Sequence, residues 1–244
     1  MLNEGLLEGT FRSAIMGREA EMKKLLSALD AAFRSEGSLI LIEGEAGIGK
    51  SRIIAELAKH AKAKGANFYS GKCLYSEGSD PYLPFIDALR NTAEQEKGYS
   101  SQLAIFGIGK ENDASRLITE GTLSDITREK TQVFETVLQY ILKLAESSPI
   151  VFFLDDLHMA DASSLQLFYY LGRNTQRARV LLIGAYSPEE LSGEKGKNHP
   201  LVELIQRLSR EKFYSSIKLS RLKPYEVTKM LSSILGSEYL ENRW

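Results

Sequence analysis

Residues 44–51 are the segment that most restricts what this chain can fold into. They read GEAGIGKS: Gly44 and Gly49 are five positions apart, and a lysine and a serine follow directly. The apolar run 39–42 precedes this segment, and apolar residues at helical spacing follow it between 53 and 61. A glycine-rich turn between a buried strand and an amphipathic helix is typical of phosphate-binding loops. The alternative is a surface turn in which the Lys-Ser pair is accidental.

Each position of this loop has a physical task. Glycines let the backbone curl and turn its N–H groups toward a bound phosphate. The helix that begins near Lys50 adds free N–H groups and partial positive charge. Lys50 can reach the β- and γ-phosphates of a nucleotide, and the Ser51 hydroxyl can bind Mg²⁺. The predicted nucleotide-binding residues of the loop are Gly44, Glu45, Ala46, Gly47, Ile48, Gly49, Lys50, Ser51 and Arg52.

Short apolar runs alternate with helical patterns along the rest of the chain. Further strands are predicted over 68–71, 150–154, 180–186 and 216–219, and Pro224 is expected to begin a last helix. This alternation predicts an α/β fold with a mostly parallel sheet covered on both faces. Residues 95–128 lack a clear period, so short helices and loops are expected there.

A second candidate element is the acidic end of the strand predicted over 150–154, which runs directly into Asp155 and Asp156. Asp155 is placed to bind Mg²⁺ through water, and Asp156 to orient or deprotonate an attacking water. The sequence shows no obvious basic partner, so these carboxylates would repel each other unless a cation lies between them. The alternative is an Asp pair that forms a turn and caps a helix.

Composition excludes several classes of function. The chain has 244 residues and a net charge of -1, which argues against a whole-molecule electrostatic grip on nucleic acid or anionic lipid. The cluster of basic residues within 207–223 is interpreted as a solvated helix face and sheet edge rather than a nucleic-acid patch. Cys73 is the single cysteine, so an intramolecular disulfide is excluded. No apolar run approaches the roughly 20 residues of a bilayer span, and a cytoplasmic protein without a membrane partner is expected.

Motifs in the expected order carry a family resemblance. Residues 15–19 (IMGRE), the phosphate loop, and 153–161 (FLDDLHMAD) resemble the ATPase domains of the STAND class within the AAA-type P-loop NTPases. Members of this class are signal-transduction ATPases with numerous domains. The chain is most similar to the ATPase modules of large multidomain regulators, including those joined to nucleotide cyclases or tetratricopeptide repeats.

The resemblance implies a P-loop NTPase fold and several residue roles. It implies a five-stranded parallel sheet in the order 5-1-4-3-2, with Gly17 and Arg18 against the adenine. Arg18 could instead be a helix-start residue paired with Glu19 or Glu21. Ser187 stands where the family often has an arginine that contacts the γ-phosphate. A hydroxyl supplies no charge there, which predicts slow hydrolysis.

Two histidines have different expected positions. His158 takes the family's usual position after the acidic pair, where it either senses the nucleotide or packs at the edge of the site. His199 has no metal-ligand spacing and is expected at the surface.

These observations predict an ATPase domain over 1–222 and the start of a truncated helical lid over 223–244. The expected function is to bind ATP and Mg²⁺ and hydrolyse ATP slowly, as the switch module of a larger regulator. Lys50 and Asp156 are the predicted catalytic residues, and Ser51 and Asp155 the metal ligands. Expected partners are ATP and ADP, the absent lid and effector domains or a partner protein, and other copies of the chain. The alternatives are a non-hydrolysing nucleotide-binding interaction module and an initiator-like DNA-binding ATPase.

Overall fold

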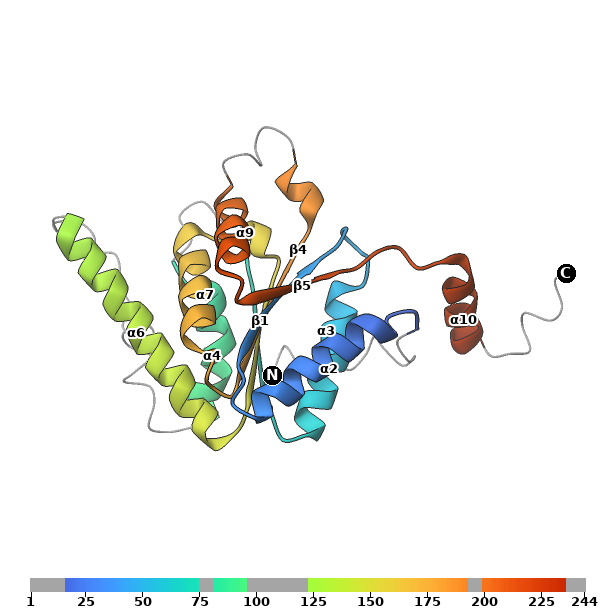
Figure 1. Ribbon diagram of the computed structural model, residues 1–244, viewed down its shortest axis with the longest axis horizontal. Coiled ribbons are helices and arrows are strands. Elements are labelled where there is room, and N and C mark those ends of the chain that lie inside the picture. The colour runs from blue at the N-terminus through green and yellow to red at the C-terminus, as the bar shows by residue number, and fades with distance from the viewer. Residues whose placement is uncertain (1–15, 75–80, 96–122, 193–198, 236–244) are drawn as a thin grey trace, which may run out of the picture.

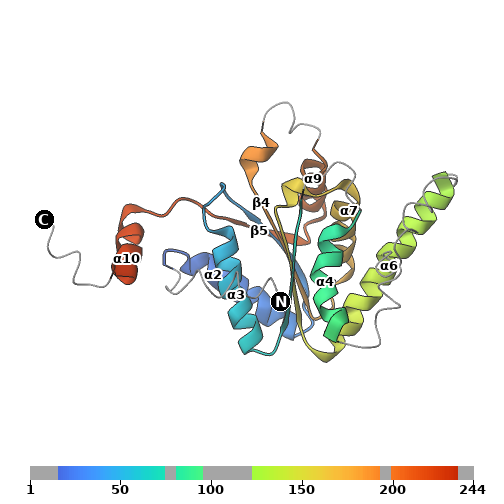
Figure 2. The same cartoon turned by 180° about the vertical axis from the view of Figure 1, so that it is seen from behind.

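A parallel sheet forms the centre of the protein, and helices cover both of its faces (Figures 1 and 2). The computed structural model describes residues 16–74, 81–95, 123–192 and 199–235. The sheet has five strands in the order β2-β3-β4-β1-β5, which confirms the expected fold class and strand order. The strands are β1 (Ser38–Glu43), β2 (Asn67–Lys72), β3 (Ile150–Asp155), β4 (Val180–Tyr186) and β5 (Tyr214–Lys218).

The helices divide between the two faces of the sheet. Two of them, α2 (Glu19–Phe33) and α3 (Lys50–Ala63), pack together on one face. On the other face lie α4 (Leu83–Gln95), α6 (Leu123–Ser147), α7 (Ala162–Asn174) and α9 (Pro200–Glu211). The remaining described elements are the short 3-10 helices η2 (Leu157–Met159) and η3 (Pro188–Leu191), and helix α10 (Pro224–Leu235), which lies beyond the edge strand β5 (Figure 1).

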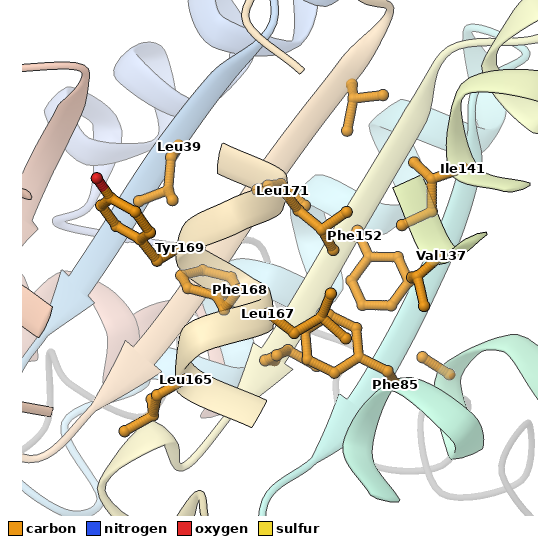
Figure 3. Close-up of a cluster of buried hydrophobic side chains, with 14 of the residues drawn as sticks. Leu39, Phe85, Val137, Ile141, Phe152, Leu165, Leu167, Phe168, Tyr169 and Leu171 are labelled. Atoms are coloured by element: carbon orange, nitrogen blue, oxygen red, sulfur yellow. The ribbon is translucent and has the colours of Figure 1, made fainter. Parts of the chain in front are cut away.

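Alternate strand residues feed two separate cores because successive side chains of a strand point to opposite faces. On the face of α2 and α3 the core is mainly aliphatic. The opposite core is rich in aromatic side chains, and Figure 3 shows residues of α4, α6 and α7 gathered around β3 there. Phe85 of α4 stacks on Phe152 of β3 at 5.5 Å between ring centroids. Leu57 of α3 is fully buried in the other core, which fixes the helix that follows the phosphate loop.

Some element boundaries differ from the sequence-based expectations. Residues 123–128, expected to be irregular, form the beginning of the 25-residue helix α6. The sequence there is largely polar, so it carries no apolar period that would mark a helix; residues 96–122 lie outside the described part of the chain. Strand β5 begins at Tyr214, before the expected 216, because its register pairs Tyr214 with Leu39 of β1. Pro224 is the first residue of α10, as predicted. None of the helices described is both long and apolar enough to cross a membrane.

Candidate nucleotide-binding site

The loop over 44–49 lies between the end of β1 and the start of α3, as the sequence predicts. Its curl requires glycine at particular positions. Gly47 and Gly49 have φ angles of 75° and 106°, in the left-handed region that favours glycine. At Gly44, an added Cβ would lie 2.8 Å from Cγ2 of Ile48. The loop is therefore tightly packed at Gly44 and has a left-handed backbone at Gly47 and Gly49. This conformation turns backbone N–H groups toward the concave side of the loop.

Lys50 is buried at the mouth of this loop, with 7% of its surface exposed. Its ammonium donates hydrogen bonds to the carbonyl oxygens of Gly44 at 2.7 Å and Glu45 at 3.1 Å. It also donates to the hydroxyl of Ser187 at 2.8 Å. The last contact exists because β4 pairs directly with β1, so that Tyr186 lies opposite Glu43 and Ser187 follows at the same edge. The structure thus places Lys50 and Ser187 side by side.

Ser51 at the start of α3 and Asp155 at the end of β3, the two predicted metal ligands, lie within hydrogen-bonding distance of each other. The Ser51 hydroxyl donates to Oδ2 of Asp155 at 3.1 Å. Burial, and secondly the charge of Asp156, raise the pKa of the Asp155 carboxyl above its ordinary value. The Asp155 carboxylate is therefore disfavoured in the absence of a cation. A hydroxyl and a carboxylate at this separation are a donor set that suits Mg²⁺.

Asp156 does have a basic partner, so the expectation that the acidic pair lacks one is wrong. Its Oδ2 lies 3.4 Å from Nζ of Lys72. The strands explain the contact, because β2 runs parallel to β3 with Lys72 opposite Asp155, which places the ends of both strands together. Asp156 also adopts a left-handed backbone (φ 55°, ψ 45°), which Asp tolerates better than most residues. Its carboxylate is thus held at the end of β3 by a cation from the neighbouring strand.

Two acidic contacts of the loop were not predicted. The Ala46 N–H donates to Oε1 of Glu189, a residue of η3, at 2.5 Å. Glu45 accepts two hydrogen bonds from Arg221, at 3.0 Å from Nε and 2.8 Å from Nη2. The sequence gives one signal for the first contact. Glu189 closely follows the strand β4, and β4 pairs with β1, the strand that leads into the loop.

A hydrogen-bonded path leads from Ser187 to the start of α9. The Ser187 N–H donates to Nδ1 of His158 at 3.4 Å, and Nε2 of His199 lies 2.9 Å from the carbonyl oxygen of His158. His199 Nδ1 accepts from the Leu201 N–H at 3.1 Å, so the proton of a neutral His199 ring lies on Nε2. His199 is therefore the N-cap of α9 and is partly exposed; its capping role was not predicted. Pro200 begins the helix, and the orphan N–H groups beyond it explain the cap.

Gly17 and Arg18 lie at the junction of three segments. Gly17 has a φ of 71° and packs so closely on Leu222 and Glu226 that a Cβ would lie 2.9 Å from each side chain. The Arg18 guanidinium donates to the carbonyl oxygens of Ile48 at 3.2 Å and Ser220 at 2.6 Å. It also pairs with a glutamate of α2, Glu21, at 3.3 Å, as the structural alternative for this residue anticipated. Contact of Gly17 and Arg18 with adenine remains a prediction.

Two further features of the site are the position of Arg52 and the supply of metal ligands. Arg52 lies in the first turn of α3. Within the described residues, no group of three or more His, Cys, Asp and Glu side chains gathers to hold a metal. A magnesium ion at Ser51 and Asp155 would thus take its other oxygen ligands from phosphate groups and water.

Known proteins share this sequence pattern and this fold. A family model described as "AAA ATPase domain" matches residues 14–183, more than half of the chain. A relative from Rhizobium meliloti (strain 1021), named "Uncharacterized protein R02095", is 24% identical over an alignment of 203 residues that covers 75% of this chain and 19% of that protein. This chain therefore spans about a fifth of the length of that relative.

The solved structure of the Aeropyrum pernix ORC1 protein in complex with DNA is similar in fold. Its TM-score is 0.51 at 17% sequence identity, with 95% of this chain and 53% of that chain covered. At this identity the likeness concerns the fold alone.

Proposed function

Because this chain belongs to the AAA ATPase domain family, we propose that it binds ATP with Mg²⁺ and hydrolyses the nucleotide slowly. Family membership supports nucleotide binding in general. Support for this particular site comes above all from one contact, the 3.1 Å hydrogen bond from Ser51 to Asp155. It brings together a loop residue and a strand-end residue that are 104 positions apart, at the place where a phosphate-bound Mg²⁺ would lie.

The residues of the site have separate tasks in this proposal. The loop N–H groups and the free N–H groups at the start of α3 bind the phosphates. Lys50 leaves the carbonyl oxygens of its own loop and turns its ammonium to the β- and γ-phosphates. Ser51 and Asp155 hold Mg²⁺, which neutralises phosphate charge when bound. Asp156 orients the attacking water and accepts its proton. Phosphoryl transfer depends mainly on such positioning and electrostatics.

Slow turnover is expected from two features of the strand ends. Lys72 holds the Asp156 carboxylate at 3.4 Å, so this carboxylate has to leave an ion pair before it can orient an attacking water. Ser187 contributes a hydroxyl and no charge toward the γ-phosphate. A tightly bound, slowly hydrolysed nucleotide suits a switch, and the chain matches only 19% of its long relative. We therefore propose a STAND-type switch module, with the domain over 1–222, the lid beginning at 223, and effector domains or other copies of the chain as partners.

The test is titration calorimetry with ATP in the presence of Mg²⁺, with Lys50→Ala compared with the wild type. Loss of a charge-assisted contact to phosphate costs about 1.5–3 kcal/mol, which corresponds to roughly a 10- to 150-fold weaker affinity. The matched control is Lys59→Ala, because Lys59 is an exposed lysine of the same helix. Equal ATP affinity in Lys50→Ala and Lys59→Ala would show that the nucleotide binds elsewhere or not at all.

A second candidate is a module that binds nucleotide without hydrolysing it and changes its associations accordingly. The Lys72–Asp156 ion pair and the uncharged Ser187 both favour it. Steady-state phosphate release separates the two functions. Release by the wild type above that of Asp156→Asn supports the ATPase, and equal release supports the binding module.

A further inference from the structure

One backbone donor of the phosphate loop is already taken by an acidic side chain. The Ala46 N–H donates to Oε1 of Glu189, which comes from η3, 143 residues later in the chain. By contrast, the N–H groups at the start of α3 have no acceptor within their own helix. In the proposed function the donors at the start of α3 bind phosphate, whereas the Ala46 N–H earlier in the loop holds a carboxylate.

The Glu189 carboxylate lies near Lys50, the residue that reaches the γ-phosphate in the proposed function. Lys50, the residue that reaches the β- and γ-phosphates, donates to Ser187, only two positions before Glu189. The Glu189 N–H, the Ala46 N–H and then the charge of Lys50 lower the pKa of the Glu189 carboxyl, so the side chain is an anion at neutral pH. An anion in this place interacts with the same donors and the same ammonium that a γ-phosphate would use.

We propose that Glu189 makes this site discriminate against ATP relative to ADP, because its carboxylate occupies a loop donor near Lys50 that a γ-phosphate would use. ADP binds at the end of the loop nearest α3 and leaves Glu189 in place. ATP has to displace the carboxylate or bear the repulsion between two neighbouring anions. This inference rests on the proposed nucleotide-binding function and adds to it a residue that sets the preference between substrate and product.

The expected size of the effect follows from the exposure of Glu189. Glu189 is solvent-exposed, so water screens the repulsion strongly. For like charges a few ångströms apart at the surface, a change in relative affinity of about three- to tenfold is expected. The same argument predicts a dependence on ionic strength, since the distance beyond which salt largely screens exposed charges falls from about 10 Å at 0.1 M to about 3 Å at 1 M.

The experiment compares Glu189→Gln with Glu190→Gln, its exposed neighbour on η3. Glutamine keeps the size and an acceptor oxygen of Glu189 but removes the charge. The dissociation constants of ADP and of a non-hydrolysable ATP analogue are measured with Mg²⁺ by calorimetry. Glu189→Gln should shift the preference about three- to tenfold toward the ATP analogue, and this shift should shrink between about 0.05 M and about 0.5 M salt. Glu190→Gln should retain the wild-type ratio.

The outcomes separate this inference from the function on which it rests. If the wild type binds neither nucleotide, the proposed function is overturned and the inference with it. If both nucleotides bind and Glu189→Gln shows the wild-type ratio, or the same shift as Glu190→Gln, the inference alone is overturned. A shift confined to Glu189→Gln but independent of salt would overturn the electrostatic explanation.

Discussion

The two halves of the candidate site are built differently. The phosphate-loop half, residues 44–51, has the glycine geometry and the buried lysine that phosphate binding requires. The strand-end half consists of Asp155, Asp156, His158 and Ser187. Its proposed base, Asp156, is paired with a lysine, and Ser187 supplies a hydroxyl rather than a charge. The difference teaches that holding a nucleotide and turning it over are separate properties. This chain is equipped more fully for the first.

The largest expected effect, and the strongest test of whether binding and hydrolysis are separate, comes from removal of the proposed base. Asp156→Asn should lower steady-state phosphate release about a hundredfold or more, the usual contribution of a general base, and should leave ATP affinity within about threefold. Asn is suitable because it also tolerates the left-handed backbone of this position. Phosphate release and calorimetry on the same preparations measure the two effects. A parallel loss of affinity would mean that the strand-end half also carries binding.

Removing the metal ligand should have a smaller effect, on metal dependence. Asp155→Asn removes a carboxylate but keeps an oxygen that can accept from Ser51. We expect the gain in ATP affinity on adding Mg²⁺ to fall about 10- to 100-fold, as with other groups that support a bound metal. Titrations with and without the metal measure this gain. An undiminished gain would place the metal away from β3.

The smallest expected effect comes from breaking the ion pair of Lys72 with Asp156, which releases the Asp156 carboxylate to turn toward the attacking water of the proposed reaction. Lys72→Gln removes the cation beside Asp156, and an exposed ion pair of this kind is worth about 0.2–1 kcal/mol. Phosphate release should therefore rise by up to about fivefold, with no change in ATP affinity. Lys72→Arg keeps the charge and is the control that should retain the wild-type rate. A lower rate in Lys72→Gln would show that the lysine assists the strand-end half rather than restraining it.

How far the sequence predicts the site depends on whether a contact is local. Gly44–Ser51 and Asp155 could be found because each motif has its chemistry within a few residues of a strand end. Strand order also followed, through the family resemblance. Lys72 was missed because its pairing with Asp156 depends on the register between β2 and β3. The same holds for Glu189, whose partner Ala46 is 143 positions away.

The start of helix α6 was not predicted, for a different physical reason. The apolar period predicts a helix only where one face of it is buried. The polar beginning of α6, from Leu123, shows no such period, whereas Val137 and Ile141 later in the same helix are fully buried. The helical period is therefore visible in the sequence only over the later part of α6.

The strand order has a consequence for how the protein is made. The loop follows β1, and both neighbours of β1 in the sheet, β4 and β5, come late in the chain, ending at Tyr186 and Lys218. During synthesis β1 therefore waits without a partner until most of the domain has left the ribosome, and such late, distant pairings fold slowly. The contacts of the loop with Ser187 and Glu189 can form only after β4 has been made. A nucleotide can then stabilise the finished domain, but it cannot guide the early part of the nascent chain.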